Sequence, residues 1–108
     1  MTDSNLPWSE QYRTAAEDWA DAESAAQLLE DMKSVVMAQR QAQMGDIPVN
    51  RAEQAVKASK GWEDYIQSVV DARTKANKAK VQVEYLRMKF QENQSHEATL
   101  RQEMKMTT

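Results

Sequence analysis

The sequence contains no cysteine, and it has only two glycines, two prolines and one phenylalanine in 108 residues. Without cysteine there can be neither a disulfide framework nor a zinc or iron–sulfur site with thiolate ligands, and the absence fits a reducing compartment. Residues that interrupt helices are scarce, whereas Ala, Gln, Glu, Lys and Met, which favour helices, are abundant. The composition therefore predicts an all-α protein.

Long apolar runs are also lacking. No window approaches the ~18 consecutive apolar residues of a membrane-spanning helix. The first residues, MTDSNLPWSEQ, have neither the basic region nor the apolar region of a signal peptide. We therefore expect a cytoplasmic protein that makes no membrane contact.

Motifs of catalysis and metal binding are missing as well. The sequence has no Gly-rich phosphate loop, no HExxH and no cysteine nucleophile. Its single histidine, His96, has Glu92 and Glu97 nearby, which are too few ligands for a protein metal site. We expect a protein that is not an enzyme and that uses no cofactor or metal.

Helical periodicity begins after a polar N-terminus, residues 1–6, which we expect to be flexible. Apolar residues then recur every three or four positions and predict a first helix over about 7–44. The segment GDIPVN, residues 45–50, predicts a turn, because glycine suits the end of a helix and proline cannot continue one. Asn50 and Glu53 have the spacing of a capping box for a second helix that begins near residue 51.

The second helix is predicted over about 51–106. Its apolar positions alternate in steps of three and four over several heptads, the period of a coiled coil. Gly61 lies within this run and allows a kink or a brief interruption near residues 59–61. At ~1.5 Å per residue, the second helix is about 80 Å long and the first about 55 Å.

A six-residue connection favours antiparallel neighbours, so the sequence predicts a two-helix hairpin, coiled-coil-like, in a single domain over residues 7–108. The longer second helix overhangs the first. Trp19 is expected near Ala76, so that large residues meet small ones. The predicted core comprises Tyr12, Trp19, Leu29, Trp62, Tyr65, Val69, Val83 and Leu86.

Charge is distributed unevenly between the two predicted helices. Residues 1–50 carry nine acidic and three basic groups, whereas residues 51–108 carry eleven basic and eight acidic groups. Six of the basic groups lie in residues 72–90. In the hairpin, four carboxylates lie opposite much of this basic segment, so internal pairing is one explanation for it: Glu17, Asp18, Asp21 and Glu23 face Arg73, Lys75, Lys78 and Lys80.

The other explanation is a surface that contacts a nucleic acid or an acidic protein. Arg73, Lys80 and Arg87 recur every seven residues along one edge, and Lys89 follows. The net charge of −3 and the pI near 5.2 argue against a nonspecific nucleic-acid binder, which is normally basic.

The predicted overhang, residues 91–108, carries Leu100, Met104 and Met106 on or near one face. This stripe needs a cover, and a second copy of the chain or another protein would supply one. We also expect Trp8 and Tyr85 to lie near one another at the open end of the hairpin. The candidate partner-binding residues are Arg73, Lys80, Arg87, Lys89, Phe90, Leu100, Arg101 and Met104.

The segment ARTKANKAKVQVEYLRMKFQENQSHEATLRQEM, residues 72–104, resembles a family of small uncharacterised phage and prophage helical proteins encoded in early regions. The resemblance covers about a third of the chain. It implies an accessory role in recombination or DNA metabolism, in the cytoplasm of the host cell. It supplies no catalytic residues, and it marks for testing Asn77, Lys80, Phe90, Thr99, Arg101 and Glu103.

Together these features favour a non-enzymatic, phage-type adaptor or inhibitor. It would bind a protein of DNA recombination, repair or host defence through its basic edge and its overhang, as a dimer. The first alternative is direct nucleic-acid binding along the basic edge. The second is a purely structural protein built from oligomeric hairpins.

Overall fold

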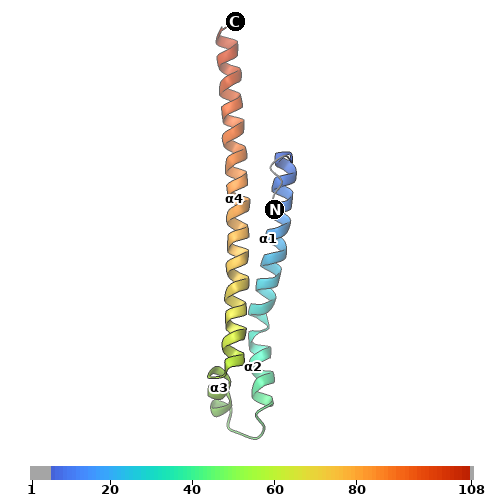
Figure 1. Cartoon of the computed structure of the whole chain (residues 1–108), viewed down its shortest axis with the longest axis vertical. Helices are drawn as coiled ribbons and strands as arrows, with labels where there is room; N and C mark the ends of the chain where they lie inside the picture. Colours follow the sequence, from blue (N-terminus) through green and yellow to red (C-terminus); the bar gives the residue numbers. More distant parts are fainter. Residues whose placement is uncertain (1–5, 108) are drawn as a thin grey trace.

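The computed structural model describes residues 6–107, which are mostly helical and include no strand (Figure 1). The helices are α1 (Trp8–Asp31), α2 (Lys33–Ala42), α3 (Val49–Lys57) and α4 (Lys60–Thr107). The predicted all-α class is confirmed, but four helices are present where the sequence predicts two. The N-terminus expected to be flexible lies, apart from Leu6, outside the described residues.

The predicted first helix is interrupted at Met32, between α1 and α2. The hydroxyl of Tyr65, in α4, donates a hydrogen bond to the Leu29 carbonyl oxygen. In an unbroken α-helix this carbonyl would accept from the Lys33 N–H. A side chain that inserts into the hydrogen-bond ladder is a common cause of a helix kink. We therefore attribute this break to a contact with α4.

The turn between α2 and α3 follows the predicted turn in part. Gly45 has a φ of 79°, in the left-handed region that glycine adopts without a steric penalty. The predicted capping box is wrong: α3 begins at Val49, so Asn50 lies inside the helix, and no side chain caps it. Pro48, with φ fixed near the helical value at −56°, starts the helix earlier, and its carbonyl accepts from the Ala52 N–H at 3.0 Å.

The interruption that the sequence allows near Gly61 lies just before that residue, between α3 and α4. The Ser59 hydroxyl donates to the Val56 carbonyl at 2.6 Å and accepts from the Trp62 N–H at 3.2 Å, so it caps the start of α4. A Cβ at Gly61 would lie 2.8 Å from Nη1 of Arg40. The glycine thus leaves room for the α2 arginine against α4.

The molecule is a long rod of 87 × 21 × 17 Å. Its radius of gyration is 23.7 Å, compared with about 13 Å for a compact domain of this length. α1 lies along α4 and runs in the opposite direction, while α2 and α3 form the bend (Figure 1). The C-terminal part of α4 continues past the start of α1.

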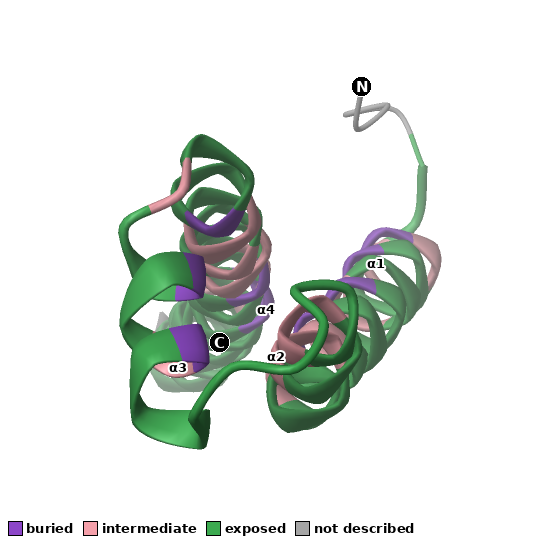
Figure 2. Ribbon diagram, turned by 90° about the horizontal axis from the view of Figure 1, so that it is seen from below, coloured by how far each residue is buried: buried purple, intermediate pink, exposed green. Residues whose placement is uncertain are grey.

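The core is narrow and consists largely of alanine. Figure 2 shows that the buried residues follow the inner faces of α1, α3 and α4. Ala22, Ala26 and Ala76 form one buried cluster, and Ala15, Val83 and Leu86 form another. Small side chains let two helices approach closely. The other buried residues are Gln11, Ala52, Val56 and Trp62.

The predicted core residues fall into three groups. Trp62, Val83 and Leu86 are buried. Four more are half-buried, namely Trp19, Leu29, Tyr65 and Val69. Tyr12 was placed wrongly, because 41% of it is exposed. Gln11 and Ala15 occupy the face toward α4, and Tyr12 is turned about 100° around the helix from Gln11.

The pairing of α1 with α4 is shifted by about one turn from the expected register. The sequence predicts Trp19 beside Ala76, but Ala22 and Ala26 pack with Ala76 instead. Trp19 packs against the cluster that contains Val83. The shift packs alanine against alanine in this cluster and leaves the large indole of Trp19 half-buried.

Candidate functional site

An apolar cleft lies where α1 begins and α4 continues beyond it. α1 contributes Trp8, Ser9 and Tyr12, and α4 contributes Leu86, Arg87 and Phe90. Pro7 precedes α1, so beyond this level no helix of the described residues lies beside α4. The cleft has a volume of about 370 Å³. We refer to these six residues as the aromatic cleft.

Lys89 lies beside the aromatic cleft and between two rings. Its Nζ is 5.9 Å from the centre of the Trp8 ring and 5.7 Å from that of Tyr85, and it donates to the Tyr85 hydroxyl at 3.4 Å. Cations at these distances are attracted to the faces of aromatic rings. Lys89 thus connects the start of α1 to α4, and Trp8 and Tyr85 lie near one another at the open end of the hairpin, as the sequence predicts.

Beyond the aromatic cleft, no other helix in the described residues lies beside residues 91–107, the overhang (Figure 1). The apolar stripe of α4 continues into it and is exposed, by 44% at Leu100 and 68% at Met104. Met106, at 80%, is also exposed. Monomeric proteins usually cover such a stripe.

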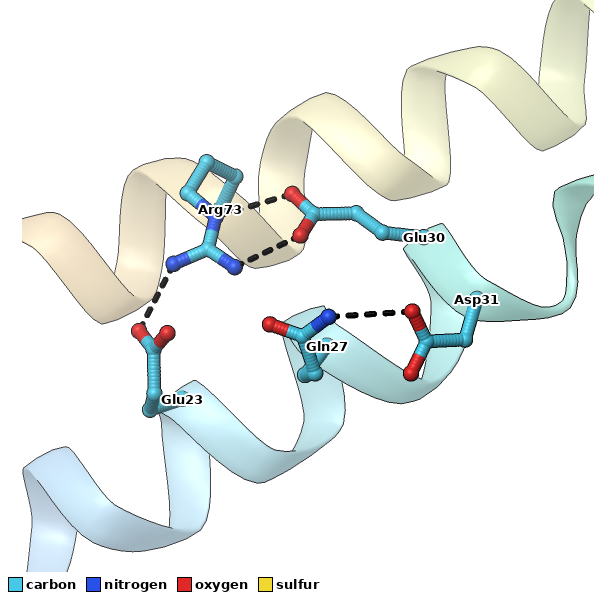
Figure 3. Close-up of polar contacts among 5 residues, drawn as sticks. All are labelled: Glu23, Gln27, Glu30, Asp31 and Arg73. Atoms are coloured by element: carbon cyan, nitrogen blue, oxygen red, sulfur yellow. Dashed lines mark hydrogen bonds and ion pairs between the residues drawn. The ribbon is translucent and has the colours of Figure 1, made fainter.

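Arg73 and two carboxylates of α1 form the ion-pair cluster that ties α4 to α1 (Figure 3). Arg73 donates to both Glu30 oxygens, at 2.7 and 2.9 Å, and to Glu23 at 2.7 Å. The hydrogen bonds that Arg73 donates to Glu30 and Glu23 raise the pKa of Arg73, and those that Glu30 accepts lower the pKa of Glu30. A bidentate pair of this kind fixes orientation as well as charge. Arg73, a candidate for partner binding, is therefore occupied inside the chain.

The other expected cross-helix charge pairs do not form as predicted. Lys80 places its Nζ 6.0 Å from the centre of the Trp19 ring instead of on a carboxylate. Lys75 lines an open groove with Asp18 and Asp21, but among the described residues it makes no ion pair. Of the four basic residues expected to pair across the helices, Arg73 is the one that forms ion pairs with α1 among the described residues.

The remaining candidate residues are distributed along the C-terminal part of α4. Arg87 lines the aromatic cleft and makes no ion pair within the described range. Phe90 is 40% exposed at the edge of that cleft. Arg101 lies 3.7 Å from Glu97 of the same helix, and both side chains are largely exposed. The structure thus brings Arg87, Lys89 and Phe90 together, and it leaves Leu100, Arg101 and Met104 on the overhang.

Sequence reasoning placed Tyr12 in the core and missed it as a lining residue of the cleft. The signal that could have found it is the spacing of Tyr12 from Trp8. Trp8 and Tyr12 are four residues apart, so they lie on one face of the first turns of α1, beside the level at which α4 loses its partner. Periodicity finds such a face but does not show whether a neighbouring helix covers it.

Within residues 6–107, no group of three or more His, Cys, Asp or Glu residues could hold a metal ion. None of the helices in this described range combines the length and the apolar character needed to cross a bilayer. Comparison of the chain with protein-family models, with curated proteins and with solved structures finds no match. The phage-type resemblance therefore stays a prediction.

Proposed function

We propose that the chain is a non-enzymatic adaptor or inhibitor, a coiled-coil-like hairpin that binds a protein partner through the aromatic cleft and the overhang. The single observation that carries this proposal is the continuation of the α4 apolar stripe past the start of α1, where it is exposed. An amphipathic helix commonly buries such a stripe against a partner. The resemblance to phage early-region proteins suggests a partner in recombination, repair or host defence.

The arrangement of the cleft supports a protein ligand. Its walls are aromatic and aliphatic, with Arg87 among the lining residues and Lys89 nearby. Aromatic residues and arginine are enriched at the centres of protein interfaces. A partner helix with one apolar anchor and an acidic flank has the matching chemistry.

The test is capture of bacterial proteins on the immobilised chain, followed by mass spectrometry. We expect capture to be lost when the chain is shortened to residues 1–90, and also in the double variant Leu100→Asp/Met104→Asp. The matched control is Gln102→Asp, which adds a charge to the outward face of the same helix and should leave capture unchanged. Circular dichroism should show that both variants stay helical. Equal capture by all of these chains would refute the proposal.

Direct nucleic-acid binding is the second candidate. It is supported by Arg87, which lies beside the aromatic groups of the cleft, because cations with stacking rings are typical of single-strand binding. Replacing Arg73, Lys80, Arg87 and Lys89 by Gln should remove binding, and the wild-type affinity should fall steeply as salt rises. No binding of the wild-type chain to DNA or RNA at low salt would exclude this candidate.

A further inference from the structure

The overhang keeps the heptad spacing of the paired part of α4. Trp62, Val83 and Leu86 occupy this seam where α1 and the bend cover it, and Phe90 follows four residues later. The same alternation of three and four then leads to the remaining seam positions, which are Asn93, Glu97, Leu100 and Met104. A seam of this spacing is complementary to another helix with the same period.

The sequence of the overhang is complementary to itself when two copies run in opposite directions. If Phe90 lies opposite Leu100 of a second copy, then Asn93 lies opposite Glu97, and Leu86 lies at the level of Met104. Apolar residues thus meet apolar residues, and polar residues meet polar ones. Because the pairing is two-fold symmetric, each of these contacts occurs twice.

One charge pair beside the seam favours the same arrangement. In the antiparallel pair, Lys89 lies beside Glu103 of the second copy. Arg87 comes near Arg101 of the second copy, whose charge is met by Glu97 of its own helix at 3.7 Å. A parallel pair would instead place Glu97 against Glu97 in the seam, where like charges repel.

The aromatic cleft provides room for the end of the second helix. In the antiparallel register, Met104 of the second copy reaches the level of Leu86 and Phe90, which line the cleft of about 370 Å³. Methionine is flexible and fits irregular apolar surfaces. Its side chain is 68% exposed in the single chain, so pairing would cover it.

We infer that the occupant of this surface is a second copy of the chain, paired antiparallel through residues 86–107. The inference rests on the proposed function and refines it: a second copy occupies the overhang, and the further protein binds the dimer so formed. The dimer is a longer rod with an α1–α4 pair at each end. It buries the overhang and leaves Lys75 and Lys78, which make no ion pair among the described residues, at both ends for a further acidic partner.

Sedimentation of the purified full chain tests the association. We expect a dimer of twice the 12.4 kDa chain mass at micromolar concentration. Leu100→Asp should raise the dissociation constant at least tenfold, whereas Gln102→Asp, on the outward face, should leave it within twofold. A full chain that remains a monomer at several hundred micromolar would overturn the inference.

Spin-label distances test the direction of pairing. The chain has no cysteine, so a single cysteine can be placed at will. Labels at Ser95→Cys lie near the two-fold axis, and we expect them within about 30 Å of each other, because packed helices have axes about 8–10 Å apart. Labels at Lys78→Cys should be about 50 Å apart, since each is seventeen residues from position 95 at ~1.5 Å per residue. Short distances at both positions would indicate a parallel dimer and overturn the inference.

These measurements need no other protein, so they separate the inference from the proposed function. A monomeric chain that still captures a bacterial protein through residues 91–107 would refute the dimer and keep the adaptor. An antiparallel dimer that captures nothing would keep the dimer and refute the adaptor.

Discussion

α4 has two halves that share one heptad period but differ in what covers them. In residues 60–90 the seam lies against α1 and the bend, and its closest contacts are made by alanine, as at Ala76. In residues 91–107 the seam includes Asn93, Glu97 and an exposed Leu100. Small residues suit a permanent contact formed within the chain, whereas polar interruptions weaken a contact, so that it can form and separate.

The largest effect should come from one matched pair of truncations. Leu86→Ala removes a side chain that is only 5% exposed and should lower the free energy of unfolding by about 2–5 kcal/mol. Leu100→Ala, on the same seam but 44% exposed, should change it by less than about 0.5 kcal/mol. Denaturant unfolding of dilute protein measures both. Equal losses would show that the two halves do not differ.

A second substitution should make the overhang resemble the part of α4 that lies against α1. Glu97→Leu completes the apolar seam of the overhang, and burial of one leucine contributes about 1.5–3 kcal/mol. Self-association should therefore tighten by roughly tenfold or more, measured by sedimentation over a range of concentrations. Unchanged association would mean that this seam position is not buried in any assembly.

The ion-pair cluster gives the paired half a pH dependence. Hydrogen bonds from Arg73 lower the pKa of Glu30 below its ordinary value, so the stabilisation is fully present above the unfolded pKa and is lost as the pH falls through the folded one. Glu30→Gln should remove this part of the loss of stability at acidic pH. The resulting change in the free energy of unfolding should be smaller than that caused by Leu86→Ala. Thermal unfolding between neutral and acidic pH tests it.

The matched control for this substitution is Glu92→Gln on the overhang, where Glu92 makes no ion pair among the described residues. It should leave the pH profile of the wild-type chain unchanged. A profile altered equally by the two substitutions would mean that the cluster is not the source of the acid sensitivity.

The smallest effect should come from Lys80→Gln, which removes the cation beside the Trp19 ring. A cation–π contact at an exposed site contributes about 0.5–1 kcal/mol. The melting temperature should fall slightly, and the tryptophan fluorescence should change. The control is Lys78→Gln, because Lys78 makes no ring contact or ion pair within the described residues. Equal changes in melting temperature and fluorescence for the two substitutions would contradict the contact between Lys80 and the Trp19 ring.

Much of the fold can be predicted from the local sequence. The scarcity of glycine and proline, the heptad seam and the GDIP turn predict the helices and their approximate ends, because these signals act within a few residues. The interruption before Gly61 was allowed by the sequence, but the break at Met32 was not predicted. The break at Met32 coincides with the Tyr65 hydrogen bond to Leu29, a contact between residues far apart in the sequence.

The candidate site was predicted less well than the helices. Arg73 and Lys80 belong to a regular basic edge in the sequence, but one is bound by carboxylates and the other lies beside a ring. The pairing of Arg73 with Glu23 was expected as one of the two explanations of the basic segment. By contrast, the Glu30 contact and the position of Lys80 beside Trp19 accompany the shifted register. A register depends on how side chains from two helices fit together, and periodicity alone leaves neighbouring registers nearly equivalent.

The sequence by itself determined the helical class, the turn near residues 45–50 and the apolar stripe that continues to Met104, because backbone propensity and side-chain period are local properties. Only the tertiary structure decided which cations make contacts within the chain, where Tyr12 lies and how far α1 covers α4. Those outcomes depend on the contact of alanine with alanine between helices distant in sequence, which sets the register and thereby opens the aromatic cleft.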